Sequence, residues 1–155
     1  MTKDVLVSIS GMHMDVMAEP AREMQDAIEI VTPGSYYWRS GKHYIVYDQA
    51  IEGSAEKIRN TIKITGTGSM EIIKSGMTSA HMVFEEGRRN YTYYRTPYGQ
   101  MLVGVNTKKM DVSVEDETIK ICVDYELDIN HEPLADCEIR MSVVQKENGD
   151  FSMFD

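Results

Sequence analysis

Along most of the chain, apolar and polar residues alternate in short segments that end at Gly, Pro, Asn or Asp. A period of two places successive side chains on opposite faces of a β-strand, whereas a helix repeats its apolar positions every three to four residues. The clearest segment is 118–129, whose apolar residues share one parity: Ile119, Ile121, Val123, Tyr125, Leu127 and Ile129. Such a strand buries one face and exposes the other. The pattern predicts an all-β protein.

Ten segments of this kind follow one another and are joined by short connections. We expect strands at 4–10, 27–39, 42–48, 57–65, 69–75, 78–85, 88–96, 100–114, 118–129 and about 135–143. Connections of about two to five residues join antiparallel neighbours, because a parallel pair needs a crossover of about a dozen residues. A meander of one-sided strands buries its apolar face by closing into a barrel. We therefore predict an antiparallel up-and-down β-barrel of about 8–10 strands.

Two irregularities interrupt this pattern. The apolar parity of 100–114 changes across Thr107-Lys108-Lys109, which predicts a β-bulge that bends the strand. Residues 11–26 show no alternation, and they contain four of the twelve methionines. Flexible thioether side chains fill irregular space. We interpret this N-terminal loop either as a plug at one end of the barrel or as a mobile lid at a ligand entrance.

Length and composition narrow the class of protein. The 155 residues suit one domain, spanning 1–155, with enough surface to bury a core. The apolar content of 42% is too high for a disordered acidic chain, and no apolar run approaches the roughly 20 residues of a membrane helix. The N-terminus lacks the features of a signal peptide. We expect a cytoplasmic protein that binds no membrane.

Charge and reactive residues exclude further functions. The net charge of −9 argues against nucleic acid as a partner, because contacts from Lys and Arg to phosphates supply most nonspecific affinity. Strand parity places Cys122 on the outer face and Cys137 on the inner face of one hairpin, so we expect two free thiols. The four histidines, at 13, 43, 81 and 131, lack the spacing of metal ligands. We expect no metal, no cofactor and no catalytic constellation.

The stretch 88–96 is the most informative for binding, because it combines tyrosines with an arginine. A two-residue turn at Glu86-Gly87 would turn its odd-numbered residues from 91 to 95 inward, beside Phe84. A buried arginine needs an acidic partner or an anionic ligand. A three-residue turn shifts the register by one, which places Tyr94 inside and Arg95 in solvent. From the first register we take as candidate ligand-binding residues Tyr91, Tyr93, Arg95, Tyr36 and Phe84.

Several motifs resemble a known family. They are the runs 76–87, 94–99 (Tyr-Arg-Thr-Pro-Tyr-Gly) and 105–107, and the segments 4–9 and 34–47 also fit. Together they resemble the YwiB-like bacterial proteins, an uncharacterised family with a calycin-type barrel. Similar sequences tend to carry Arg where this chain has Lys74. The resemblance implies a small lipocalin-like barrel from a bacterium and brings no established activity.

Three hypotheses follow. The first is a non-enzymatic binding module of the bacterial cytoplasm, whose barrel holds a small, partly apolar or anionic ligand. The second is a structural or protein-interaction barrel with a side-chain-filled core that acts through its surface or as a homodimer. The third is a hydrolase or isomerase that uses His81 or an inward carboxylate. No catalytic motif in the sequence supports this third hypothesis. A solid interior argues against the first, and an isolated His81 argues against the third.

Overall fold

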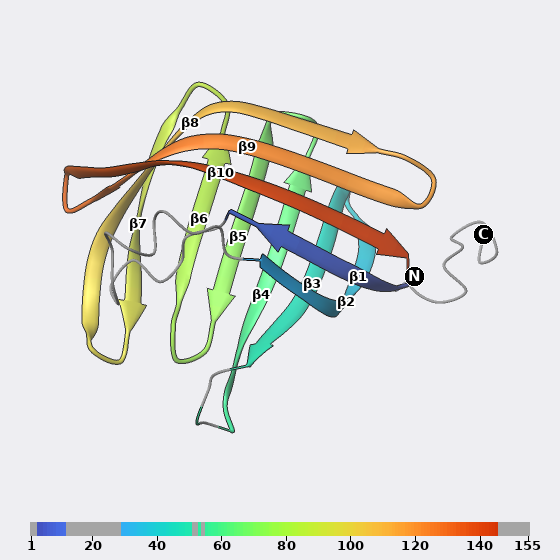
Figure 1. Cartoon of the computed structure of the whole chain (residues 1–155), viewed down its shortest axis with the longest axis horizontal. Helices are drawn as coiled ribbons and strands as arrows, with labels where there is room; N and C mark the ends of the chain where they lie inside the picture. The colour runs from blue at the N-terminus through green and yellow to red at the C-terminus, as the bar shows by residue number, and fades with distance from the viewer. Residues whose placement is uncertain (1–2, 12–28, 51–52, 54, 146–155) are drawn as a thin grey trace.

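A computed structural model describes residues 3–11, 29–50, 53 and 55–145, which form ten strands in a nearly closed antiparallel barrel (Figure 1). The strands are β1 (Lys3–Ser10), β2 (Glu29–Arg39), β3 (Lys42–Ala50), β4 (Lys57–Thr65), β5 (Ser69–Ser75), β6 (Ala80–Glu85), β7 (Arg89–Thr96), β8 (Gly99–Val114), β9 (Thr118–Ile129) and β10 (Glu132–Gln145). The predicted all-β class, strand number and antiparallel meander are confirmed.

The first and last strands close the barrel. The hydrogen-bonded order is β6-β5-β4-β3-β2-β1-β10-β9-β8-β7. β1 pairs with β10, from Val5 opposite Gln145 to Ser10 opposite Arg140. The two edges of the sheet are therefore β6 and β7. These strands follow each other along the chain and lie side by side in the barrel wall (Figure 1).

Local predictions are confirmed in the long strands. The register between β8 and β9 shifts between Thr107 and Lys109, at the expected bulge. Cys137 is buried inside the barrel, whereas Cys122 is half-buried on the outer face, and both are free thiols. The expected N-terminal loop lies outside the described residues from position 12 onward. Within the described chain, no helix has the length and hydropathy that crossing a bilayer would take.

The middle of the barrel is filled by its own side chains. Phe84 of β6 and Tyr125 of β9, two of the largest fully buried residues, meet edge to face with 5.2 Å between ring centroids. Fully buried isoleucines pack around them: Ile9, Ile45, Ile62, Ile64, Ile72, Ile121 and Ile139. Close packing of this kind is usual in small barrels. As far as the described residues extend, the centre of the barrel is a packed hydrophobic core.

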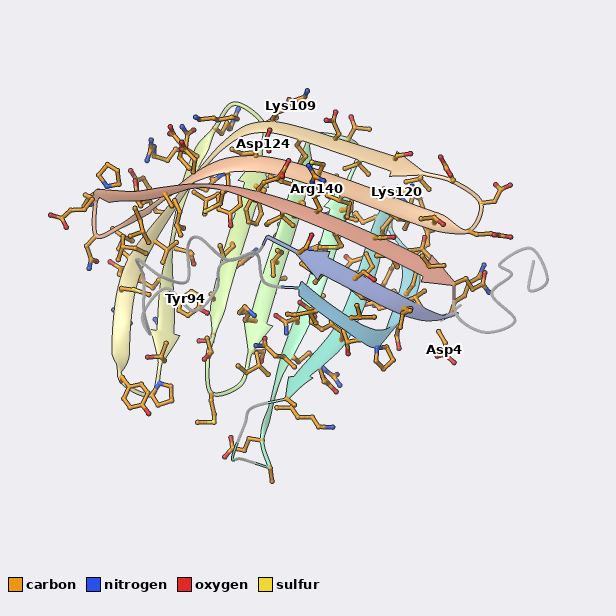
Figure 2. All side chains as sticks on the ribbon, viewed as in Figure 1. Asp4, Tyr94, Lys109, Lys120, Asp124 and Arg140 are labelled. Carbon is orange, nitrogen blue, oxygen red and sulfur yellow. The ribbon has the colours of Figure 1, made fainter. Side chains whose placement is uncertain are left out.

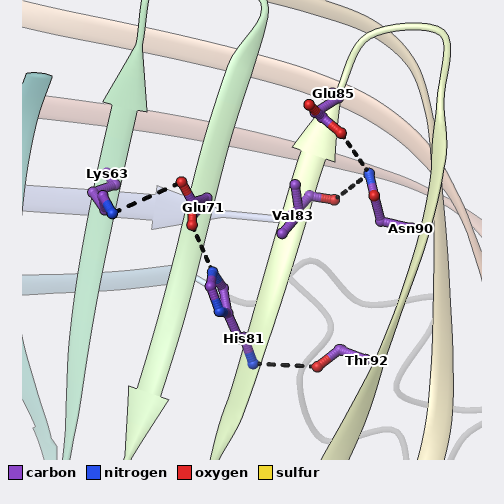
Figure 3. A network of polar contacts seen from close by, with 7 residues as sticks. All are labelled: Lys63, Glu71, His81, Val83, Glu85, Asn90 and Thr92. Carbon is purple, nitrogen blue, oxygen red and sulfur yellow. Dashed lines mark hydrogen bonds and ion pairs between the residues drawn. The ribbon is translucent and has the colours of Figure 1, made fainter.

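The wall between β6 and β7, which we call the seam, is only partly hydrogen-bonded. Ser79 and Arg95 exchange both backbone hydrogen bonds, each 2.9 Å long. Beyond this bridge the described residues of β6 and β7 form no ladder, and Figure 3 shows side chains in its place. The hydroxyl of Thr92 accepts a hydrogen bond from the backbone N–H of His81, and Asn90 donates to the carbonyl oxygen of Val83.

The turn that starts the seam is bonded to β8 as well as to β6, since the N–H of Arg88 donates to the carbonyl oxygen of Glu85 at 2.9 Å and two further bonds join the turn to β8. Three residues, 86–88, separate the two strands. The N–H of Gly87 donates to the carbonyl oxygen of Thr107, and the N–H of Thr107 donates to the carbonyl oxygen of Arg88. These bonds hold the start of β7 at the β8 bulge. Of the two turns that the sequence left open, the three-residue turn is therefore correct and the two-residue turn is wrong.

We predict that Gly76→Ala destabilises the fold. Gly76 ends the β5 hairpin with a φ of 143°, and a Cβ there would lie 2.9 Å from the carbonyl oxygen of Lys57. Backbone strain and this contact should lower the free energy of unfolding by about 1–3 kcal/mol. Urea denaturation measures the change. Gly68→Ala is the matched control, because open space surrounds Gly68, and it should change stability by less than about 0.5 kcal/mol. Equal effects would contradict the argument.

Candidate functional site

A shallow cavity, wide open to solvent, lies in the barrel wall at the seam. Its volume is about 380 Å³, and its lining comes from β5, β6, β7 and the residue before β6: Lys74, Ser79, Ala80, His81, Thr92, Tyr93 and Arg95. We call it the seam cavity. Residues on both faces of the wall line it, because the incomplete ladder leaves room between the strands. It lies at the Ser79–Arg95 bridge, where the last backbone hydrogen bonds between the two edges are made.

The inner side of the seam cavity is built on a buried polar row that crosses three strands. Tyr47 lies opposite Asn60, and Asn60 lies opposite Lys74. All three side chains are buried, and Lys74 is only 4% exposed. The Lys74 ammonium donates to Oδ1 of Asn60 at 2.7 Å and to Oε1 of Gln49 at 3.1 Å. Such hydrogen bonds offset the cost of burying an ammonium group.

The next residues along this row connect it to the seam. Lys74 lies opposite Ala80, and the Ser79–Arg95 bridge sets Ala80 opposite Tyr94. Tyr94 is buried on the inner face, and Figure 2 shows its side chain between β7 and the neighbouring strands. The row thus leads from the interior of the barrel to the seam.

The outer side of the seam cavity carries a second cation and an aromatic ring. Arg95 is exposed, and its guanidinium forms no ion pair with the residues that the structure describes. Tyr93 is 54% exposed. Between them the two sides of the cavity present an ammonium, a guanidinium and an aromatic ring. This combination suits a small ligand with an anionic group and an apolar part.

His81 is not isolated on the outer face. Its Nε2 lies 2.6 Å from Oε1 of Glu71, and Lys63 lies 4.0 Å from the other Glu71 oxygen (Figure 3). A histidine held by a carboxylate is one part of many acid–base sites. Among the described residues, however, the other ring nitrogen of His81 has no hydrogen-bonded side chain. The pair orients the ring at the mouth of the seam cavity, where the hydroxyls of Ser79 and Thr92 also lie, and no hydrogen bond between described residues joins either hydroxyl to the His81 ring.

The five predicted ligand residues separate into three groups. Tyr91, Tyr93 and Arg95 face outward, so their expected interior position is wrong because the turn has three residues. Tyr93 and Arg95 still line the seam cavity, from its outer side. Phe84 belongs to the filled core, and Tyr36 packs against that core. Ligand binding by these residues stays a prediction.

Tyr36 lies in a separate aromatic cluster on the β2–β3 hairpin. Its hydroxyl is 2.9 Å from Nδ1 of His43, whose ring also packs edge-on against Trp38. Burial raises the pKa of Tyr36 and lowers the pKa of His43. Both shifts favour the neutral forms, so this pair is a neutral hydrogen bond near pH 7. Tyr36 does not line the seam cavity.

Lys74 and Asn60 are the functional candidates that sequence analysis missed. Both side chains point to the buried face of their strands. On β5, Lys74 shares this face with Met70 and Ile72, and on β4, Asn60 shares it with Ile62 and Ile64. A polar residue at an apolar position is the signal that could have found them. That signal identifies a buried polar group but gives no partner, because the partner lies on another strand.

One further group brings three possible metal ligands together on the outer face, from Cys122, Asp124 and Glu138. The Cys122 thiol donates to Oε2 of Glu138 at 3.6 Å. Burial, followed by the carboxylate of Glu138, raises the pKa of this thiol. Exposed acidic groups of this kind are common without a metal, so the cluster alone carries no metal assignment.

Comparison with known proteins identifies the family. The family described as "Domain of unknown function (DUF1934)" matches residues 13–141. The chain belongs to this family. It is 24% identical to the "Uncharacterized beta-barrel protein YwiB" of Bacillus subtilis (strain 168) over 108 residues, which are 70% of this chain and 74% of that protein.

The structure of this DUF1934 protein also matches a solved one. The crystal structure of the ywiB protein from Bacillus subtilis superimposes with a TM-score of 0.75 at 16% identity, over 94% of each chain. The predicted resemblance is confirmed. At this identity the match shows a shared fold, and neither relative's description names an activity.

We predict that Tyr47 makes the folded state sensitive to high pH. Burial raises the pKa of Tyr47 to about 12, from an ordinary value of 10.0. Between these values the unfolded chain loses the phenolic proton and the folded chain keeps it, so stability falls as pH rises. The full contribution is about 2–3 kcal/mol. Urea denaturation at pH 9 and above measures the fall, which should be smaller in Tyr47→Phe. An identical pH dependence in both proteins would contradict the assignment.

Proposed function

We propose that this protein is a non-enzymatic binding module of the bacterial cytoplasm that holds a small, partly apolar anion at the seam cavity. The observation that supports this most directly is that Lys74 from inside the barrel and Arg95 from outside line one cavity. The original hypothesis placed the ligand in the centre of the barrel. Because side chains fill the core, we propose the site in the barrel wall instead.

The seam cavity has the size and chemistry of a small-molecule site. Its volume of about 380 Å³ falls within the usual range of about 300–1,000 Å³. Arg95 can bind a carboxylate or phosphate with two parallel hydrogen bonds, and Tyr93 offers a ring for an apolar part. Ser79 and Thr92 add hydroxyl groups. Burial of Lys74 strengthens its attraction for an anion, because the local dielectric is lower than in water.

The alternative function is a structural or protein-interaction barrel, and one observation favours it. Leu6 and Val144 are cross-strand neighbours on the outer face of β1 and β10, and both are exposed by more than a third. Val31 on β2 is 60% exposed. Apolar side chains gathered on an outer face are typical of contact surfaces. Sedimentation of the purified protein distinguishes a homodimer from a monomer.

We predict that octanoate binds at the seam cavity and that Arg95→Gln weakens this binding about tenfold or more. The loss follows from removing a charge-assisted hydrogen bond. Isothermal titration calorimetry measures the dissociation constants. Arg59→Gln is the matched control, because Arg59 is an exposed arginine on β4 outside the cavity, and it should leave binding unchanged.

Two outcomes would overturn the proposal. One is equal binding of octanoate by Arg95→Gln and the unaltered protein. The other is equal binding of octanoate and the neutral octan-1-ol, because the cavity is argued to select an anion. Native mass spectrometry of protein purified from its own cytoplasm then identifies any molecule that stays bound.

A further inference from the structure

A second hollow lies on the outer face of the barrel, on strands that do not form the seam. Its volume is about 670 Å³, and it crosses β1, β10, β9 and β8. The inward residues along its edge, such as Ile9, Ile121 and Met141, are almost completely buried, so its open surface belongs to the outward side chains. Figure 2 shows two of these, Lys120 and Arg140, along β9 and β10. We call it the outer hollow.

Strand register explains the shape of the outer hollow. Ser8 lies opposite Ser142, Ser142 lies opposite Lys120, and Lys120 lies opposite Ser113. One lysine therefore stands in a row of three serines across four strands. In the adjacent row, Arg140 lies opposite Cys122. Both rows line the hollow, so the two long cationic side chains stand beside short serine and cysteine side chains.

The two cations can reach one ligand. Arg140 precedes Ser142 by two residues and so is the diagonal neighbour of Lys120 on the paired strand. Diagonal neighbours are about 7–8 Å apart at the backbone, within reach of long side chains. Their charged ends can therefore converge on a single anionic group above the serine hydroxyls.

The charges around the outer hollow leave both cations available for such a group. Lys120 forms no ion pair with the residues that the structure describes. Arg140 binds Oε1 of Glu138 through Nε, at 3.2 Å, and no other ion pair joins Arg140 to a described residue. Asp111, opposite Cys122, also lines the hollow and can accept hydrogen bonds from hydroxyl groups of a ligand.

We propose that the outer hollow binds the phosphate group of a small, hydroxylated phosphate ester. Lys120 and the terminal nitrogens of Arg140 bind the phosphate oxygens, and the hydroxyls of Ser8, Ser113 and Ser142 donate further hydrogen bonds. Phosphate takes hydrogen bonds from guanidinium and ammonium groups more strongly than from neutral donors. A net charge of −9 repels polyphosphate chains, so the site suits a compact ligand rather than a nucleic acid.

The test is a titration followed by two-dimensional ¹H–¹⁵N NMR, with inorganic phosphate and with glycerol 3-phosphate as probes. Sodium chloride at equal ionic strength is the reference. We expect the amide signals of Ser8, Lys120 and Ser142 to shift with either probe and not with chloride. Glycerol 3-phosphate should bind more tightly, because Asp111 can accept hydrogen bonds from its hydroxyls.

Three variants make the test specific. Lys120→Gln and Arg140→Gln should each weaken binding of glycerol 3-phosphate about tenfold or more. Lys109→Gln is the matched control, because Lys109 is an exposed lysine on β8 that lies opposite Asp124, outside the hollow. It should leave binding unchanged. All three positions are on the surface, and far-ultraviolet circular dichroism confirms that each variant is folded.

Four outcomes would overturn the proposal, three of them with the free probes and one with vesicles. The first is that chloride shifts the same amide signals as the phosphate probes. The second is that Lys109→Gln and Lys120→Gln lose affinity for glycerol 3-phosphate equally, and the third is that Arg140→Gln binds it as tightly as the unaltered protein. A lipid headgroup carries the same phosphate chemistry, so co-sedimentation with phosphatidylglycerol vesicles is a separate arm. Binding to these vesicles without any response to the free phosphates would assign the hollow to a membrane surface and would contradict the small-molecule site. None of these measurements depends on the seam cavity.

Discussion

Pairing of the first strand with the last is the interaction on which the rest of the structure depends. The β1–β10 ladder joins the two ends of the meander and turns an open sheet into a nearly closed barrel. Closure there uses the hydrogen-bonding edges of both terminal strands. The two remaining edges are therefore strands that follow each other in the chain. Their incomplete pairing creates the seam, and the seam cavity lies within it.

Much of the fold could be predicted because strand parity is a local property. Each of the ten strands was recognisable from its own residues, and the bounds of β4, β5 and β9 match the structure at both ends. The bulge near Lys108 was visible as a change of parity within one segment. The sequence left both a two-residue and a three-residue turn open after Glu85, and no local pattern decided between them, because the bonds that hold Gly87 come from Thr107, twenty residues away. A one-residue change in this turn, fixed by a long-range hydrogen bond, reverses which side chains of β7 point into the barrel.

The candidate site was harder to predict for the same reason. Tyr93 and Arg95 were selected as a pair, and the structure keeps them together at one cavity but reverses the side from which they line it. Lys74 joins them only because β5, β6 and β7 are adjacent in space. Its hydrogen bonds to Asn60 and Gln49 cross two further strands. No local pattern encodes which polar groups meet across a sheet, since that depends on the register of every intervening ladder.

The β8 bulge connects the fold to the seam cavity through one chain of hydrogen bonds. Thr107, at the bulge, holds Gly87 and Arg88, and so fixes where β7 begins. From that point to the Ser79–Arg95 bridge at the far end, the described residues of β6 and β7 form no backbone ladder. Between these two anchors Asn90 and Thr92 substitute side-chain hydrogen bonds for a ladder. A regular β8 would lack the bulge that sets this starting point. The same irregularity that bends the sheet to close the barrel thus also keeps one part of its wall open.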